Sequence, residues 1–375
     1  LQRPFAFNMS EASGALGDLG TLLPLMLGAV VLGGMAPTPV LLGFAVFDIG
    51  TAFAYRLPIP VQPMKAVAAV LLLGQASPES VALAGVLVGA ILLGLGLTGW
   101  IDHLKRLVPQ SVLSGLQLGL GLALAIVALD LMSETPGFSL ICAAGLAALF
   151  AVRRVPVALV FLAGAAALAY LLGVPGMTLP DLSASWIAPP GWPDKADLAT
   201  ALGTLVLPQL ALTLTNAVLL TALVASDCHG TDCADRVSPR RLSVTTGLAN
   251  LFLTPLGALP MCHGAGGVAA HWRFGARTAA APLMLGLGLA IIALLPGGWG
   301  MALIATIPVA ALGALLMVAA ADLAFSKRLF DCRPSCRPVI AVTAAVTVLV
   351  GPFAGLVAGT LAEIARKAIL RRRFA

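Results

Sequence analysis

Two short polar segments, PIPVQPMK at residues 58–65 and PMCHGAGG at residues 260–267, carry the side chains best suited to binding an anion. The first contains Gln62 and Lys65, and the second contains His263. A carboxamide, an ammonium group and an imidazole can all donate hydrogen bonds to an oxyanion. Long apolar runs surround both segments, so helices in an apolar environment must position these donors.

The composition indicates a membrane protein. Of the 375 residues, 59% are hydrophobic and 10% are charged, whereas soluble domains carry about 25% charged residues. The apolar runs recur along the whole chain, so a single anchor does not explain them, and the first residues lack a signal-peptide pattern. The basic residues are scattered singly, which argues against a nucleic-acid surface. The sequence therefore predicts an all-α polytopic membrane protein.

Fourteen candidate membrane spans follow from the apolar runs, because a spanning helix needs about 20 apolar residues. They cover approximately residues 14–34, 38–55, 60–74, 78–99, 109–131, 137–151, 155–173, 199–224, 241–256, 264–272, 278–296, 300–324, 338–350 and 352–368. The third, ninth and tenth are too short to cross the bilayer as ordinary helices.

The basic residues test this count independently, because cytoplasmic loops are enriched in Lys and Arg. With a cytoplasmic N-terminus, 20 of the 22 basic residues fall on the cytoplasmic side (22 minus Lys65 and Lys195). We therefore expect both termini in the cytoplasm and the protein in the plasma (inner) membrane. The external segment 174–198 is expected to cap the protein or to lie along the membrane interface.

An internal repeat relates the two polar segments. With an offset of 201 residues (266 − 65), KAVAAV at 65–70 aligns with GGVAAH at 266–271. These are the third spans of two sets of seven. Because seven is odd, the two halves must have opposite orientations, which makes a 7+7 inverted repeat. Transporters with such repeats bind substrate near the bilayer midplane, where discontinuous helices meet.

Prolines interrupt the first segment and glycines interrupt the second. Proline cannot donate a backbone hydrogen bond, and glycine lets the chain turn and a ligand approach closely. We expect each break to begin a short half-helix, with the two N-termini facing each other. Such N-termini present unpaired N–H groups and a partial positive charge. Because Lys65 adds a full positive charge, the predicted substrate is an anion.

Three segments resemble the molybdate/sulfate transporter family, which is related to the SulP anion transporters. They are SGALGDLGTLLPL (13–25), PVQPMKAVAAV (60–70) and PMCHGAGGVAAHWRFGART (260–278). The resemblance implies molybdate or sulfate as substrate and the seven-plus-seven fold shared with uracil permeases. It also implies a core domain from residues 1–103 and 199–297, and a gate domain from residues 104–198 and 298–375.

The candidate substrate-binding residues lie at the two half-helix starts and at polar positions of the first and eighth spans. They are Gln62, Met64, Lys65, His263, Gly264, Ala265, Gly266, Gln209, Asn216, Asp18 and Thr21.

Several charged candidates have alternative roles. Lys65 could reach a membrane interface or pair with Asp48 for structural reasons alone. Asp18 could be a proton carrier, the partner that keeps Lys65 charged, or a helix-terminal acid near the cytoplasmic face. His263 could be an oxyanion donor, a proton-linked switch or a helix cap.

The eighth span carries a polar stripe. Gln209, Thr213 and Asn216 are spaced by four and three residues, which places them on one helix face. Such a stripe either lines a substrate path or holds helices together. Asn250 and Thr254 in the ninth span are expected to be helix-packing groups.

Other functions fit the sequence less well. A nucleobase permease of the same fold would need carboxylates in the eighth and tenth spans, which have none before their cytoplasmic ends. An anion channel would have a continuous pore, and a membrane enzyme would have to use Asp102 and His103, which have no evident nucleophile nearby. No cofactor or metal is expected. The coupling ion (H⁺ or Na⁺), the choice among molybdate, sulfate and tungstate, and a homodimer stay open.

Overall fold

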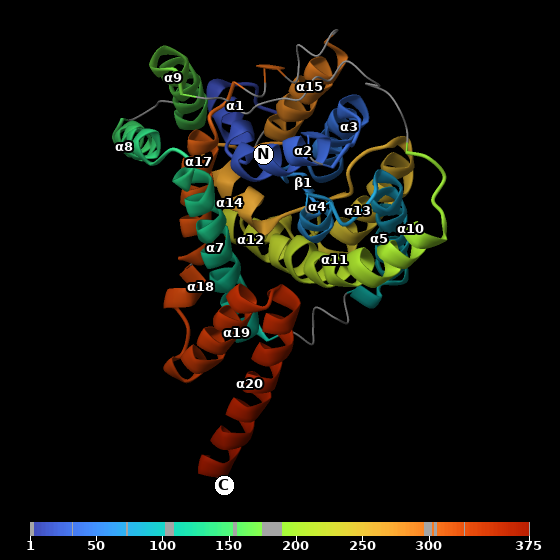
Figure 1. The fold of residues 1–375 in the computed structure, drawn as a ribbon. Coiled ribbons are helices and arrows are strands. Elements are labelled where there is room, and N and C mark those ends of the chain that lie inside the picture. The colour runs from blue at the N-terminus through green and yellow to red at the C-terminus, as the bar shows by residue number, and fades with distance from the viewer. Residues whose placement is uncertain are drawn as a thin grey trace.

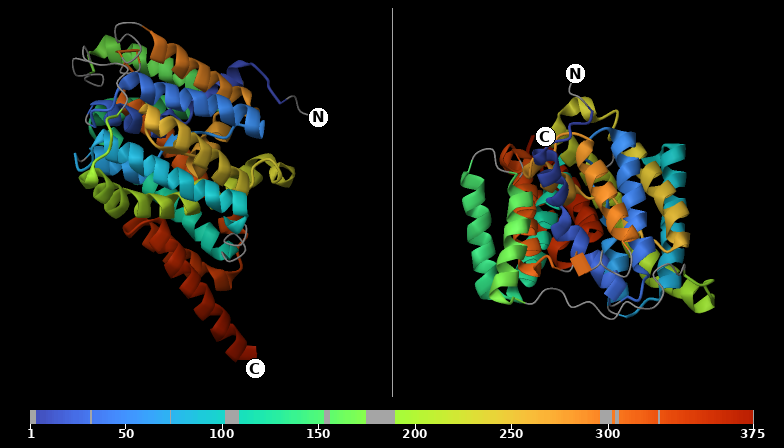
Figure 2. Two further views of the ribbon diagram at one scale, coloured as in Figure 1. Left: turned by 90° about the vertical axis from the view of Figure 1, so that its right-hand side faces the viewer. Right: turned by 90° about the horizontal axis from the view of Figure 1, so that it is seen from above.

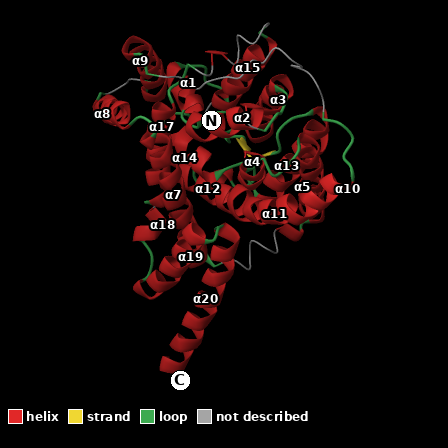
Figure 3. Cartoon of the chain, viewed as in Figure 1, coloured by secondary structure: helices red, strands yellow, loops and turns green. Residues whose placement is uncertain are grey.

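The computed structural model describes residues 4–31, 33–72, 74–101, 109–152, 156–174, 190–295, 302–303, 306–325 and 327–374. This part of the chain is helical apart from its loops and one pair of very short strands near the centre of the molecule (Figures 1 and 3). Asp102 and His103, and residues 175–189 of the predicted external segment, lie outside the described residues.

The N-terminal half contains eight described helices and one strand, in this order. They are α1 (Met9–Leu16), α2 (Leu19–Val31), α3 (Pro37–Tyr55), β1 (Gln62–Pro63), α4 (Lys65–Leu72), α5 (Pro78–Thr98), α7 (Gln110–Ser133), α8 (Pro136–Ala151) and α9 (Val157–Leu172).

The C-terminal half begins with a continuous helix, Lys195–His229. It consists of α10 (Lys195–Thr200), η1 (Ala201–Val206), α11 (Leu207–Leu212), η2 (Thr213–Leu220) and α12 (Thr221–His229), of which η1 and η2 are π-helical. The elements that follow are η3 (Thr231–Cys233), α13 (Pro239–Leu253), η4 (Thr254–Leu256), β2 (Met261–Cys262), α14 (Ala265–Arg273), α15 (Ala280–Leu294), α17 (Val309–Ala324), α18 (Lys327–Phe330), η6 (Pro334–Cys336), α19 (Arg337–Leu349) and α20 (Pro352–Phe374).

Local signals begin and end several of these helices. The Ser77 hydroxyl accepts a hydrogen bond from the Ser80 N–H at the start of α5, and Gly99 ends that helix with φ +74°. The Ser238 hydroxyl accepts from the Arg241 N–H at the start of α13. Capping side chains satisfy the N–H groups that a helix start leaves unpaired, and glycine adopts positive φ without strain.

Within the described residues, α3, α5, α7 and the helix Lys195–His229 are long and apolar enough to cross a membrane. A fifth candidate is the pair α1 and α2, which is bent by 50°. Asp18, expected one turn inside the first span, lies instead at this bend, between the end of α1 and the start of α2. The break frees its side chain from a regular helix face, so it can reach toward β1.

Long-range helix pairs build the body of the protein. The closest pairs are α7 with α17, α5 with α13, α3 with α15, and α7 with α19. Small residues allow helices to pack this closely. A Cβ on Gly247 of α13, for example, would lie 2.7 Å from the Leu93 nitrogen of α5. Figure 2 shows these helices side by side, with α20 extending away from them toward the C-terminus.

Candidate anion-binding site

The two interrupted segments meet in space. β1 and β2 pair as antiparallel strands, with Gln62 opposite Cys262 and Pro63 opposite Met261. The half-helices α4 and α14 begin two and three residues after their strands. The strand pair brings the starts of α4 and α14 together from the two halves of the chain. The predicted juxtaposition of the two broken helices is therefore confirmed.

A buried pair of polar side chains lies against the first turn of α14. The Gln62 amide nitrogen Nε2 donates to both carboxylate oxygens of Asp18, at 2.7 and 2.9 Å. Both residues are at most 2% exposed. A Cβ on Gly264 would lie 2.0 Å from Gln62 Oε1, and a Cβ on Gly267 would lie 2.7 Å from Asp18 Oδ2. Glycine at both positions therefore makes room for the Gln62–Asp18 pair.

The N-terminus of α14 has no side-chain cap. Gly264 stands at the cap position in extended conformation and makes no capping hydrogen bond. Within the described part of the chain, the N–H groups of Ala265, Gly266 and Gly267 have no hydrogen-bond acceptor. These three residues are buried. Such orphan N–H groups, together with the helix dipole, favour an anion.

The N-terminus of α4 is different, because a side chain from the long helix caps it. Gln209 Oε1 accepts from the Ala66 N–H at 2.9 Å and is 3.4 Å from the Val67 nitrogen. Gln209 Nε2 in turn donates to Thr213 Oγ1 at 2.9 Å, as expected for residues on one helix face. Gln209 thus binds the protein's own helix start in this structure.

Lys65 is the first residue of α4 and is half-buried. Among the described residues, no carboxylate lies within 4 Å of its ammonium group, and the group forms no hydrogen bond. Asp18 attracts it from a longer distance. A positive charge in the first turn opposes the helix dipole, so this position is favourable only if negative charge gathers nearby.

His263 connects the two segments through both ring nitrogens. Nδ1 lies 2.9 Å from the Pro60 carbonyl oxygen, and Nε2 lies 3.1 Å from the Tyr55 hydroxyl and 3.2 Å from the Thr245 hydroxyl. A carbonyl only accepts, so Nδ1 is the donor, and Nε2 of the neutral ring accepts. His263 is fully buried. This geometry supports a role in positioning the strands and does not support direct contact with substrate.

Two further side chains hold the strand pair, and the sequence pattern did not single them out for this role. Asn250 donates to the Met261 carbonyl at 2.6 Å and accepts from the Met261 N–H at 2.9 Å. His271 Nδ1 donates to the Pro58 carbonyl at 3.1 Å. Asn250 was expected to pack helices, whereas its amide binds the free edge of β2. The sequence signal that could have indicated this contact is the position of Asn250, an amide in the span directly before the interrupted segment 260–267.

The contacts of the remaining candidates, Met64, Thr21 and Asn216, show no ligand role. Met64 is fully buried, and its N–H donates to the Pro260 carbonyl at 2.8 Å. Thr21 is buried, and its N–H bonds to the Asp18 carbonyl in the first turn of α2. Asn216 is 4% exposed in η2, and its side-chain oxygen has no partner among the described residues.

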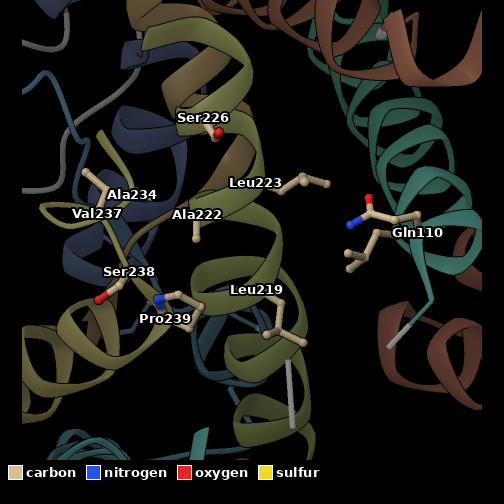
Figure 4. A pocket seen from close by; sticks show the side chains of 10 residues that line it. Gln110, Leu219, Ala222, Leu223, Ser226, Ala234, Val237, Ser238 and Pro239 are labelled. Atoms are coloured by element: carbon tan, nitrogen blue, oxygen red, sulfur yellow. The ribbon is translucent and has the colours of Figure 1, made fainter. Parts of the chain in front are cut away.

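A cavity of about 210 Å³ separates α7 from the end of the long helix. Gln110 and Leu113 line it from α7, and residues of η2 and α12 such as Leu219 and Leu223 line it from the opposite side. Figure 4 shows Gln110 facing these leucines across the gap. The two walls belong to different halves of the sequence.

Comparison with known proteins identifies the family. The model of a family described as "Molybdate transporter of MFS superfamily" matches residues 10–124 and 201–323, which is well over half of the chain. Molybdate transporter 2 of Arabidopsis thaliana is 28% identical, over 85% of this chain and 79% of its own length. Molybdate transporter 1 of the same plant is 29% identical, over 86% of this chain and 81% of its own length.

Solved structures show which fold this is. The transmembrane domain of a cyanobacterial bicarbonate transporter, BicA, superposes with a TM-score of 0.62 at 18% identity, covering 92% of this chain and 96% of that one. The murine anion transporter Slc26a9 gives a TM-score of 0.63 at 14% identity, covering 97% of this chain and 69% of that one. The fold is that of the SulP-like anion transporters, and the relatives are transporters rather than enzymes. By its sequence, this chain belongs to the molybdate transporter family.

Proposed function

We propose that this protein is a secondary-active transporter of a tetrahedral oxyanion, with molybdate as the substrate and sulfate as the competitor to test. The observation that carries the proposal is the uncapped, buried N-terminus of α14, together with a Lys65 ammonium close enough to interact with Cys262, three residues before that helix. Three N–H donors and one positive charge suit a small anion. The names of the relatives, which are molybdate transporters, support molybdate.

The packing supports the 7+7 inverted repeat. If the halves are equivalent, α3 corresponds to α13 and α5 to α15, so the contact of α3 with α15 should have a counterpart between α13 and α5. Both contacts are extensive. The pairing of β1 with β2 is its own counterpart. An antiparallel strand pair at the centre is what two oppositely oriented copies of one segment would form.

The transport step we propose is alternating access, in which a core domain (1–103 and 199–297) carries the anion past a gate domain (104–198 and 298–375). Three features at this boundary support relative movement. The cavity between α7 and α12 crosses it. Arg273 of α14 forms a half-exposed ion pair with Asp322 of α17 at 3.3 Å, and its guanidinium lies 4.8 Å from the Phe150 ring of α8. Such contacts are weak enough to break when domains move.

The distribution of basic residues supports the orientation in the membrane. With both termini in the cytoplasm of a plasma membrane, the end of α14 and the positively charged end of α20 face the cytoplasm. The cavity between α7 and α12 then opens on the cytoplasmic side, where it would release substrate.

A competition experiment tests the proposed substrate. Purified protein should bind molybdate, tungstate and sulfate in competition with one another, and uracil should not compete. Lys65→Ala should weaken molybdate binding by about 100-fold, because a buried charge-assisted contact is worth about 3 kcal/mol. Lys195→Ala, which removes a basic residue from the start of α10, is the matched control and should bind like the wild type.

Three results would overturn the proposal. Unchanged molybdate affinity in Lys65→Ala would remove the site, and displacement of bound molybdate by uracil would favour a nucleobase permease. In proteoliposomes, uptake should saturate and should be accelerated by molybdate trapped inside. Flux that rises linearly with concentration and shows no such counter-transport would indicate a channel.

A further inference from the structure

Asp48 is an acid that the proposed anion site leaves unexplained. It lies in the interior of α3, a helix of membrane-spanning length, and its exposed fraction is zero. Within the described part of the chain, neither of its carboxylate oxygens has a hydrogen-bond partner. Burying an ionised carboxylate without donors is strongly unfavourable, so binding of a proton or a cation would stabilise this group.

The surroundings of Asp48 make a negative charge still less favourable. Asp18, at the bend before α2, repels it, and the Val61 N–H acts on it only from outside hydrogen-bond geometry. On the opposite side lies the backbone of α15, where a Cβ on Gly286 would be 3.1 Å from the Asp48 Cβ. α15 carries no titratable residue.

The other charged or titratable groups near this site are few. Lys65 belongs to α4 and is attracted to Asp18. His263, which follows β2, contacts the ring of the neighbouring Phe47 at 5.1 Å and has both nitrogens bonded to other groups. Tyr55 lies at the end of α3 and bonds to that histidine.

The two buried aspartates therefore differ. Burial disfavours the charged form of both acids, but Asp18 accepts two hydrogen bonds from Gln62 and is attracted by Lys65, which partly offset that cost. Asp48 has neither kind of support. A metal cation would need several oxygen or nitrogen ligands, and no group of three His, Cys, Asp or Glu comes together among the described residues.

We propose that Asp48 is a proton-binding site whose proton is linked to the oxyanion bound at α14, an inference that rests on the proposed transport function. With Asp48 ionised, Lys65, Asp18 and Asp48 sum to one negative charge; with Asp48 protonated, they sum to zero. A dianion binds more readily beside the neutral set. By reciprocity, the bound dianion favours the protonated acid to the same degree.

The sign of the effect follows from this linkage. Affinity for the oxyanion rises as pH falls through the range in which Asp48 gains its proton, and each bound dianion takes up one proton. Anion and proton then cross the membrane together, so an inward proton gradient drives uptake.

The test compares molybdate dissociation constants from about pH 6 to pH 8, with and without Na⁺, where one linked proton changes affinity by up to about tenfold per pH unit. The wild type should bind more tightly at low pH, independently of Na⁺. Asp48→Asn, a permanent mimic of the neutral acid, should bind with little pH dependence and near the wild-type low-pH affinity. Asp130→Asn, which neutralises an exposed acid on α7, should keep the wild-type slope.

A wild-type slope in Asp48→Asn would overturn the proposal, and a requirement for Na⁺ would point to a metal ion. If the variant does not fold, calorimetry of the wild type in two buffers of different ionisation enthalpy still measures the number of protons taken up when molybdate binds. It should report uptake of about one proton per molybdate, and zero would refute the linkage. Failure of the linkage and failure of the transport function give different results. If only the linkage is wrong, the wild type still binds molybdate and Asp48→Asn still exchanges it. If the transport function is wrong, the wild type does not bind molybdate either.

Discussion

The half-helices α4 and α14 both begin shortly after a strand, but their N-terminal N–H groups differ in hydrogen bonding. Each follows one strand of the pair β1–β2, and each receives a polar side chain from the long segment that opens the opposite half of the chain. At α4 that side chain is Gln209, whose oxygen accepts from the helix N–H groups. At α14 it is Asp18, which is held by Gln62 and leaves the N–H groups unbonded.

Two helix starts in corresponding positions of the two halves can therefore differ in whether a side chain caps them. A neutral amide satisfies α4 permanently, so this helix start is structural. In the proposed function, the uncapped start of α14 is the one that binds a ligand, and Lys65 of the N-terminal half contributes its charge.

Among the variants that test this comparison of the two helix starts, the largest combined effect on binding and stability is expected from filling the space beside α14. In Gly264→Ala, the new Cβ meets Gln62 Oε1 at 2.0 Å, so the Gln62–Asp18 pair must move. We expect at least tenfold weaker molybdate binding and a loss of about 1–3 kcal/mol in the free energy of unfolding. Gly94→Ala in α5, where a Cβ meets nothing within 4 Å, is the control. Wild-type affinity in Gly264→Ala would mean that α14 does not form the site.

An intermediate effect, on stability rather than on binding, is expected at α4. Gln209→Leu leaves the half-buried Ala66 N–H and the buried Val67 N–H without an acceptor, which costs about 1–3 kcal/mol of unfolding free energy. Thermal unfolding with and without molybdate measures both quantities, and the molybdate affinity should stay within about threefold. Gln117→Leu in α7 removes a buried amide whose oxygen has no partner, and should cost less. Tighter molybdate binding in Gln209→Leu would show that the anion also uses α4.

The smallest effect is expected far from both helix starts, at the end of α14. Arg273→Ala removes a half-exposed ion pair to Asp322, worth less than about 1 kcal/mol. Transport rate should change by less than about fivefold, with unchanged affinity, because only the balance between conformations shifts. Arg366→Ala breaks an ion pair to Glu363 within α20 and a hydrogen bond to the Ser335 hydroxyl of η6, both within residues 298–375, and should leave the rate unchanged. A large loss of affinity in Arg273→Ala would contradict the assignment of this contact to the domain boundary.

Much of the fold follows from local sequence. The apolar runs predict helices close to the observed bounds, such as α8, α9, α15 and α19, because hydrophobic length and helix-breaking residues act over a few positions. The interrupted segments could be found for the same reason, since proline and glycine alter the backbone where they stand. The bend at Asp18 was not predicted, because nothing in the apolar pattern distinguishes it from a continuous span.

The roles of individual polar residues could not be predicted in the same way. His263 looked suited to an oxyanion, yet both of its nitrogens bond to the protein. Asn250 looked like a packing group, yet it binds β2. Asp48 entered only as an alternative partner for Lys65, and its isolation became visible once its neighbours were placed.

By itself, the sequence determined that this is a helical membrane protein, where two of its helices break, and to which family it belongs, because these depend on composition, short patterns and shared segments. Only the tertiary structure decided which helix start is capped and which of two acids has partners. Those outcomes depend on hydrogen bonds between residues 44 to 208 positions apart. Side chains so distant meet only after the two strands have paired, and no local pattern encodes that geometry.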